Sequence, residues 1–158
     1  MKILVVLGSG GHTAQMLKLV DMLGDRFEYA YLIGKGDALS EEKIRIKGEV
    51  YYTHSAREYG QNVFVTFLKV IRLAAESLVL IFRAKPKAIV SAGPGTAVPV
   101  SLIGKMLGRK VIFIEDWSRV YQKSGAGKII YRFADLFFIQ WPELQERYPD
   151  GIYAGRLS

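Results

Sequence analysis

Short apolar runs rich in Val, Ile and Leu alternate along the chain with longer segments in which apolar residues recur every three or four positions. The short runs predict β-strands and the longer segments predict α-helices. The predicted strands are Ile3–Leu7, Tyr29–Ile33, Glu49–Thr53, Lys87–Ser91, Lys110–Ile114 and Leu136–Ile139. The predicted helices are Thr13–Leu23, Leu39–Ile46, Val63–Arg83, Ala97–Leu107, Gly127–Phe133 and Pro142–Tyr148. This alternation predicts an α/β fold, with a Rossmann-like parallel sheet and helices on both of its faces.

Three chemically distinctive segments follow predicted strands directly. They are Gly8–His12 after the first strand, Gly93–Thr96 after the fourth and Glu115–Arg119 after the fifth. Sheets of this class bind ligands beyond the carboxyl ends of their strands. We therefore expect these three segments to meet at one edge of the sheet and to form the functional site.

The first segment, Gly8-Ser-Gly-Gly-His12-Thr13, places three glycines within four positions between a strand and a helix. Glycine lets backbone N–H groups approach a ligand closely, and a helix N-terminus favours an anion such as a phosphate. His12 adds a side chain that accepts a proton near neutral pH. The alternative is a glycine turn that only fits a tight strand–helix corner, although such a corner does not require an imidazole.

The same turn departs from the dinucleotide-binding fingerprint G-x-G-x-x-G. Thr13 stands where the third glycine is needed, and the second strand ends in Gly34-Lys35-Gly36 instead of an acidic residue that would bind a ribose. We therefore expect neither a nicotinamide nor a flavin cofactor. The sequence contains no Cys, which excludes disulfides and thiolate metal sites, and we expect no bound metal.

The other two loops carry polar groups suited to a sugar phosphate. In Gly93-Pro-Gly-Thr96 the glycines permit close backbone approach, and Thr96 is the expected N-cap of the next helix. In Glu115-Asp-Trp-Ser-Arg119 two carboxylates and a guanidinium are suited to a sugar hydroxyl or a diphosphate. The alternatives are a simple strand–helix corner in the first loop and a loop salt bridge in the second.

The predicted helix 63–84 is more apolar than packing on a sheet requires. Its polar positions gather in one arc and are Thr66, Lys69, Arg72, Glu76, Ser77 and Arg83. The rest, about 220° of the helix, is apolar, whereas a stripe of little over about 100° is usual. Charges in the middle argue against a membrane span, so we expect docking on an anionic membrane surface, with burial in the core as the alternative. The expected docking residues are Phe64, Phe67, Lys69, Arg72, Leu78, Phe82 and Arg83.

Composition narrows the functional classes further. A length of 158 residues predicts a single domain with its own core. The net charge of +7 favours anionic partners, but the basic residues are spread out and no nucleic-acid-reading motif is present, so we do not expect nucleic-acid binding. The chain begins with a strand and lacks the features of a signal peptide, which predicts a cytoplasmic protein.

Several motifs in one order resemble those of a known family. They are Gly8-Ser-Gly-Gly-His-Thr13, Gly93-Pro-Gly-Thr96, Glu115-Asp-Trp-Ser-Arg-Val120, Gln140-Trp-Pro142, Tyr148-Pro149 and Gly155-Arg-Leu157. The family is the membrane-associated subunit of the two-part UDP-GlcNAc transferase of dolichol-linked oligosaccharide synthesis (asparagine-linked glycosylation, subunit fourteen), and bacterial PssD-type exopolysaccharide proteins are similar. The resemblance covers nearly the whole chain. It implies the N-terminal, acceptor-binding half of a GT-B glycosyltransferase similar to MurG.

The resemblance also implies partners. In that family a separate subunit binds the nucleotide-sugar donor, while the membrane-associated subunit holds the lipid-linked acceptor and brings its partner to the membrane. We therefore expect a peripheral protein on the cytoplasmic face of a membrane, inactive alone, with a polyprenyl-diphosphate-linked sugar as acceptor. Eukaryotic members carry an N-terminal transmembrane anchor, and we do not expect one here, so helix 63–84 is expected to provide the membrane contact.

The resemblance assigns roles to individual residues. His12 is expected to assist deprotonation of the acceptor hydroxyl, with Glu115 as the alternative base or as the group that orients His12 or the sugar. His54 is expected to be an ordinary loop residue. The residues expected to bind the acceptor and its diphosphate are Gly8, Ser9, Gly10, Gly11, Thr13, Gly93, Gly95, Thr96 and Arg119. A non-catalytic adaptor for the donor subunit and a stand-alone nucleotide-binding enzyme are the alternative functions.

Overall fold

The computed structural model describes residues 1–54 and 63–157, and for residues 63–67 and 70 it describes the backbone only. In the described part of the chain, seven parallel strands form one sheet in the order β3-β2-β1-β4-β5-β6-β7. The strands are β1 (Lys2–Val6), β2 (Glu28–Gly34), β3 (Gly48–Thr53), β4 (Ala88–Ser91), β5 (Lys110–Ile114), β6 (Leu136–Ile139) and β7 (Ile152–Tyr153). The helices are α1 (Gly11–Leu23), α2 (Ala38–Glu42), α3 (Val63–Ala84), α4 (Ala97–Met106) and α5 (Gly125–Ile130), with 3₁₀ turns η1 (Gly24–Arg26) and η2 (Pro142–Glu146).

The structure confirms the six predicted strands, but several helices begin or end at other residues than predicted. The predicted helix Leu39–Ile46 ends at Glu42, because the following Ile44 and Ile46 leave the helix to pack against the core. The helix predicted to begin at Gly127 begins at Gly125, because the Ser124 side chain caps it by accepting a hydrogen bond from the Gly127 N–H.

Two predictions near the C-terminus were wrong. The segment Pro142–Tyr148 is not an α-helix but a 3₁₀ turn over Pro142–Glu146. A seventh strand, β7, follows it and was not predicted, because its two exposed residues are too few to produce an alternating pattern. Strand β7 nevertheless pairs with β6 in register, with Phe138 opposite Ile152.

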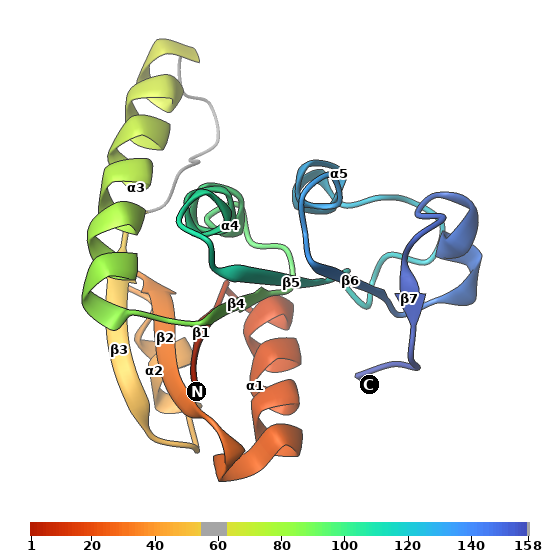
Figure 1. The fold of residues 1–158 in the computed structure, drawn as a ribbon, viewed down its shortest axis with the longest axis horizontal. Helices are drawn as coiled ribbons and strands as arrows, with labels where there is room; N and C mark the ends of the chain where they lie inside the picture. Colours follow the sequence, from red (N-terminus) through yellow and green to blue (C-terminus); the bar gives the residue numbers. More distant parts are fainter. Residues whose placement is uncertain (55–62, 158) are drawn as a thin grey trace.

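Helices cover both faces of the sheet, with α1 and α2 on one face and α3, α4 and α5 on the other (Figure 1). Alternate residues of each strand point to opposite faces, so β1 contributes to two separate cores. Ile3 and Val5 pack with Met16 of α1, whereas Leu4 and Val6 belong to the cluster that contains Ile81 of α3. Burial on both faces explains why the strands are continuously apolar in the sequence.

The order of the strands identifies the position of a ligand site. Strand β1 pairs with β2 on one side and with β4 on the other, so the chain winds outward in both directions from the gap between β1 and β4. Open parallel sheets bind ligands at the carboxyl ends of the strands that flank such a switch point. In this chain those ends carry the two glycine turns, and the loop after β5 lies beside them.

Candidate functional site

The glycine turn after β1 closes directly onto helix α1. Gly10 is the N-cap residue, with φ of 60° and ψ of −118°, a conformation that favours glycine. Its carbonyl accepts the first helical hydrogen bond, from the Ala14 N–H at 3.1 Å. The N–H groups of the next three residues therefore have no acceptor within the helix and point toward the space beyond the sheet. Ser9, Gly10 and Gly11 are exposed there.

Two of the predicted glycines lie against the imidazole of His12. A Cβ atom at Gly8 would lie 2.9 Å from the Cβ atoms of both His12 and Pro94, a distance that side chains do not tolerate. Gly93 has φ of +102°, and a Cβ there would lie 3.4 Å from His12 Cε1. Gly8 is therefore needed because His12 and Pro94 pack against it, whereas Gly93 is favoured because of its positive φ.

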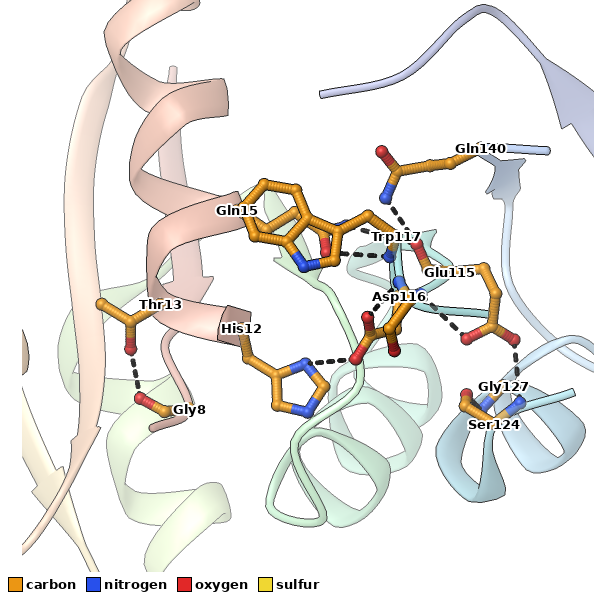
Figure 2. A network of polar contacts seen from close by, with 11 residues as sticks. Gly8, His12, Thr13, Gln15, Glu115, Asp116, Trp117, Ser124, Gly127 and Gln140 are labelled. Carbon is orange, nitrogen blue, oxygen red and sulfur yellow. Dashed lines mark hydrogen bonds and ion pairs between the residues drawn. The ribbon is translucent and has the colours of Figure 1, made fainter. Parts of the chain in front are cut away.

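The closest carboxylate to His12 in the described site is Asp116. His12 Nδ1 lies 3.3 Å from Asp116 Oδ2, and the two side chains are 28% and 16% exposed (Figure 2). This is an ion-pair distance, but the angles do not satisfy a hydrogen bond, and buried Nδ1 has no hydrogen-bond partner among the described residues. The pair joins the loop after β1 to the loop after β5.

Glu115, the predicted alternative base, lies elsewhere. Its side chain is fully buried, and its carboxylate accepts hydrogen bonds from the Tyr148 hydroxyl at 2.6 Å, the Asp116 N–H at 2.9 Å and the Ser124 N–H at 3.2 Å. Figure 2 shows it directed toward Ser124 and Gly127, away from His12. Burial and, after it, the hydrogen bond to Glu115 raise the pKa of the Tyr148 hydroxyl well above its usual range, so this hydroxyl stays a donor.

The remaining predicted ligand residues divide into buried and exposed groups. Thr13 is buried, and its hydroxyl contacts the Gly8 carbonyl and lies 2.9 Å from the Ser40 hydroxyl. It therefore stabilises the glycine turn after β1. Thr96 occupies the N-cap position of α4, but its side chain makes no capping hydrogen bond. Gly95 and Arg119 are exposed. Gln15, which sequence reasoning missed, and Gln140, which it named in a motif without a role, are buried and bind the loop after β5.

The described side chains of helix α3 form a buried face, an exposed apolar face and a polar arc. Leu73, Ser77, Leu80, Ile81 and Ala84 are buried against the sheet and α4. On the opposite side lies the α3 stripe, a row of large apolar side chains that are 40–58% exposed: Leu68, Ile71, Leu78, Val79 and Phe82. None of the described helices combines the length and apolar character needed to cross a bilayer.

The polar arc of α3 differs from the prediction at one residue. Ser77 is 2% exposed and donates to the Leu73 carbonyl at 2.6 Å, so it belongs to the buried face. Of the predicted docking residues, Leu78, Phe82, Arg72 and Arg83 are exposed and Lys69 is half-buried. The side chains of Phe64 and Phe67 lie outside the described part of the chain.

A clamp of polar contacts fastens α3 to the end of β3. Glu76 accepts hydrogen bonds from the Thr53 hydroxyl at 2.9 Å, the His54 N–H at 3.1 Å and Arg72 Nε at 3.0 Å, and its Oε1 lies 2.7 Å from His54 Nδ1. Burial acts to raise the pKa of Glu76, but the His54 backbone and side chain, Thr53 and Arg72 together lower it to about 2. His54, expected to be an ordinary loop residue, is thus part of this clamp.

Solved structures of low sequence identity share the fold. MurG from Acinetobacter baumannii superposes with a TM-score of 0.73 at 15% identity, over 98% of this chain and 43% of that one. A UDP-GlcNAc 2-epimerase from Neisseria meningitidis, bound to UDP-GlcNAc, gives 0.71 at 13% identity, over 99% and 47%. This chain therefore spans less than half the length of either protein. The shared fold is the N-terminal half of a GT-B enzyme, as the sequence predicted.

Sequence relatives are more similar. The chain is 34% identical to the UDP-N-acetylglucosamine transferase subunit ALG14 of Rattus norvegicus, over 98% of this chain and 82% of that protein. It is 35% identical to the human protein of the same name, over 99% and 83%. The family model described as "Oligosaccharide biosynthesis protein Alg14 like" matches residues 3–157. The chain therefore belongs to the Alg14-like family of oligosaccharide biosynthesis proteins.

Proposed function

We propose that this chain is the acceptor-binding subunit of a two-subunit glycosyltransferase, which transfers N-acetylglucosamine from UDP-GlcNAc to a polyprenyl-diphosphate-linked sugar. Membership of the Alg14-like family supports the reaction class, because relatives carry the name UDP-N-acetylglucosamine transferase subunit. The word subunit in that name supports a second chain, which in our proposal binds the donor. The cleft between the two chains is then the place of reaction.

The observation that carries the proposal is the His12–Asp116 pair at the switch point of the sheet. Nδ1 of His12 faces the Asp116 carboxylate at 3.3 Å, which leaves Nε2 to face the acceptor. In the proposed step the acceptor hydroxyl oxygen forms a bond to the anomeric carbon of the donor, the bond from that carbon to UDP breaks, and the hydroxyl proton moves to Nε2. Asp116 then stabilises the imidazolium, as a carboxylate does in other histidine–carboxylate pairs.

The acceptor diphosphate is proposed to lie beside the first turn of α1. The N-terminal N–H groups of this helix and the exposed backbone from Ser9 to Gly11 offer donors to phosphate oxygens. Arg119, exposed on the loop after β5, adds a positive charge. Because Glu115 is buried and satisfied, we assign it a structural role and assign the orienting role to Asp116.

The proposal is tested with the complete complex. The tagged chain is recovered from native membranes with its bound partner, and transfer from radiolabelled UDP-GlcNAc to polyprenyl-diphosphate-GlcNAc is measured for the wild type, His12→Ala and Asp116→Asn. We expect His12→Ala to retain the partner and to lose transfer, by roughly 100-fold or more. Glu146→Gln is the control, since Glu146 is exposed at the end of η2, outside the three loops of the site. Full activity of His12→Ala would refute the catalytic role and leave a non-catalytic adaptor.

The α3 stripe is proposed to dock on an anionic membrane surface. It exposes large apolar side chains directly opposite the buried face, and Arg72 and Arg83 are exposed along one side of it. This arrangement is typical of helices that lie in the interface of a bilayer.

Flotation with vesicles of phosphatidylcholine and phosphatidylglycerol tests the docking surface. Replacement of Ile71, Val79 and Phe82 by Ser should abolish co-flotation. Replacement of Met22 and Leu39 by Ser is the control, because these two side chains are 68% and 69% exposed on the other face of the sheet. Equal flotation of both variants would contradict the proposed docking surface.

A further inference from the structure

The backbone of the loop from Glu115 to Trp117 is fully hydrogen-bonded, although it lies outside the sheet ladder. The Glu115 N–H donates to the Phe138 carbonyl at 2.8 Å, and the Arg119 N–H donates to the Asp116 carbonyl at 2.9 Å. The Asp116 N–H donates to the Glu115 side chain, and the Trp117 carbonyl accepts from Trp141 Nε1 at 2.7 Å. A loop whose polar groups are all paired holds one conformation, because each alternative leaves a group unpaired.

Gln15, on helix α1, makes two of the hydrogen bonds to the backbone of this loop. Its Nε2 donates to the Glu115 carbonyl at 3.2 Å, and its Oε1 accepts from the Trp117 N–H at 3.3 Å. The side chain is fully buried and therefore has no water to replace these partners. The two contacts lie on either side of Asp116, as Figure 2 shows.

Gln15 also shares its helix with His12, three residues earlier, so the two side chains lie on neighbouring positions of one helical face. A rigid link therefore runs from His12 through one turn of α1 to Gln15 and from there to the backbone on both sides of Asp116. The length of this link determines how far Asp116 lies from His12. We infer that Gln15 is a positioning residue, which holds the Asp116 carboxylate against the imidazole of His12. The relevance of this role to catalysis rests on the function proposed above for His12.

Gln140 makes a contrasting contact. Its Nε2 donates to the same Glu115 carbonyl at 2.7 Å, but its Oε1 accepts from the Leu157 N–H at 2.8 Å, so it links the loop to the C-terminal segment and not to α1. Loss of Gln140 therefore removes a contact between the loop and the C-terminal segment. Loss of Gln15 removes two hydrogen bonds between the loop and α1, the two elements that carry the pair.

The test uses the imidazole signals of the full-length chain. The protein has two histidines, so nuclear magnetic resonance of the ring ¹³Cε1 and ¹⁵N nuclei gives one set of signals for His12 and an internal reference from His54. Gln15→Met keeps the side-chain volume and removes both hydrogen bonds. Gln145→Met is the control, since Gln145 donates to three carbonyls, those of Tyr148, Pro149 and Gly151.

We expect Gln15→Met to shift the His12 signals and to leave those of His54 in place, whereas Gln145→Met moves neither. Unshifted His12 signals in a folded Gln15→Met protein would overturn the inference. If Gln15→Met does not fold, Gln15→Asn provides the same test, because it stays neutral and polar but is one methylene too short to keep both contacts.

Kinetics of the assembled complex separate this inference from the proposed function. Gln15→Met should lower kcat between about 10- and 100-fold, the effect of misplacing a catalytic group by about an ångström, and leave the acceptor KM within about twofold. If His12→Ala is inactive while Gln15→Met keeps the kcat of Gln145→Met, the inference on Gln15 is wrong and the proposed function stands. If His12→Ala is fully active, the proposed function is wrong, and the imidazole spectra still decide whether Gln15 positions Asp116.

Discussion

Removal of the Tyr148 hydroxyl provides a quantitative test of the buried network around Glu115. Tyr148→Phe leaves the ring in place among Phe137 and Tyr131, so it creates no cavity. It removes a 2.6 Å hydrogen bond to a carboxylate that is fully buried and that no water replaces. A hydrogen bond to a charged group contributes about 1.5–3 kcal/mol, and an unsatisfied buried acceptor adds to the cost, so we expect a loss of about 2–3 kcal/mol in the free energy of unfolding.

The assay is urea unfolding followed by tryptophan fluorescence and far-UV circular dichroism, together with a thermal melt. For a domain of this size about 1 kcal/mol corresponds to a Tm change of about 2–4 °C, so Tyr148→Phe should lower Tm by about 4–12 °C. Tyr52→Phe is the matched control, because the Tyr52 hydroxyl donates to Glu41 at the same 2.6 Å but lies on the surface, with Tyr52 49% exposed. If the two variants lose equal stability, burial does not set the strength of these bonds and the reasoning is refuted.

Two further predictions concern Glu76 and Gly93. Because contacts with His54, Thr53 and Arg72 lower the pKa of Glu76 from 4.5 to about 2, its stabilisation is complete above pH 4.5 and is lost as the pH falls toward 2. At pH 7, Glu76→Gln should thus lower the free energy of unfolding by about 2 kcal/mol, allowing for partial exposure. Near pH 2 the variant and the wild type should be equally stable. The exposed control Glu146→Gln should show no such pH-dependent loss. Gly93→Ala should lose about 1–3 kcal/mol because its φ is +102°, whereas Gly95→Ala, which has open space, should be nearly neutral in the same unfolding assay.

The fold was predictable from sequence because its central strands are buried on both faces. Continuous apolar runs of three to five residues separated by helical segments leave little choice other than a parallel sheet. Strand β7 was not predictable, since its pairing with β6 arises from the position of the turn before it and not from its own two residues. The segment from Pro142 was misassigned for a related reason: its helical periodicity covers a single turn, which a 3₁₀ geometry satisfies equally well.

The sequence predicted which loops form the candidate site, but not which of their residues contact one another. The rule that ligands bind beyond the carboxyl ends of parallel strands correctly predicted that the three loops lie together. It did not decide whether Glu115 or Asp116 faces His12. Successive side chains of an extended segment point to opposite sides, so one of the two carboxylates faces α1 and the other faces α5. That choice depends on which face of the sheet α1 covers, a long-range property. Gln15 carried only a local signal, a polar residue at a buried helical position one turn after His12.

The packing of α3 determines which way the α3 stripe faces. Because Glu76, in the middle of α3, contacts the end of β3, the first turns of the helix extend beyond the carboxyl edge of the sheet (Figure 1). The contacts of Glu76 with Thr53 and His54 fix the rotation of the helix at that edge, and the packing of Leu80 and Ile81 fixes it at the other end. The side chains of the α3 stripe therefore face away from the sheet. A bilayer in contact with this stripe would therefore lie along the outer side of α3, from Leu68 beyond the carboxyl edge to Phe82 beside the sheet, on the face opposite α1.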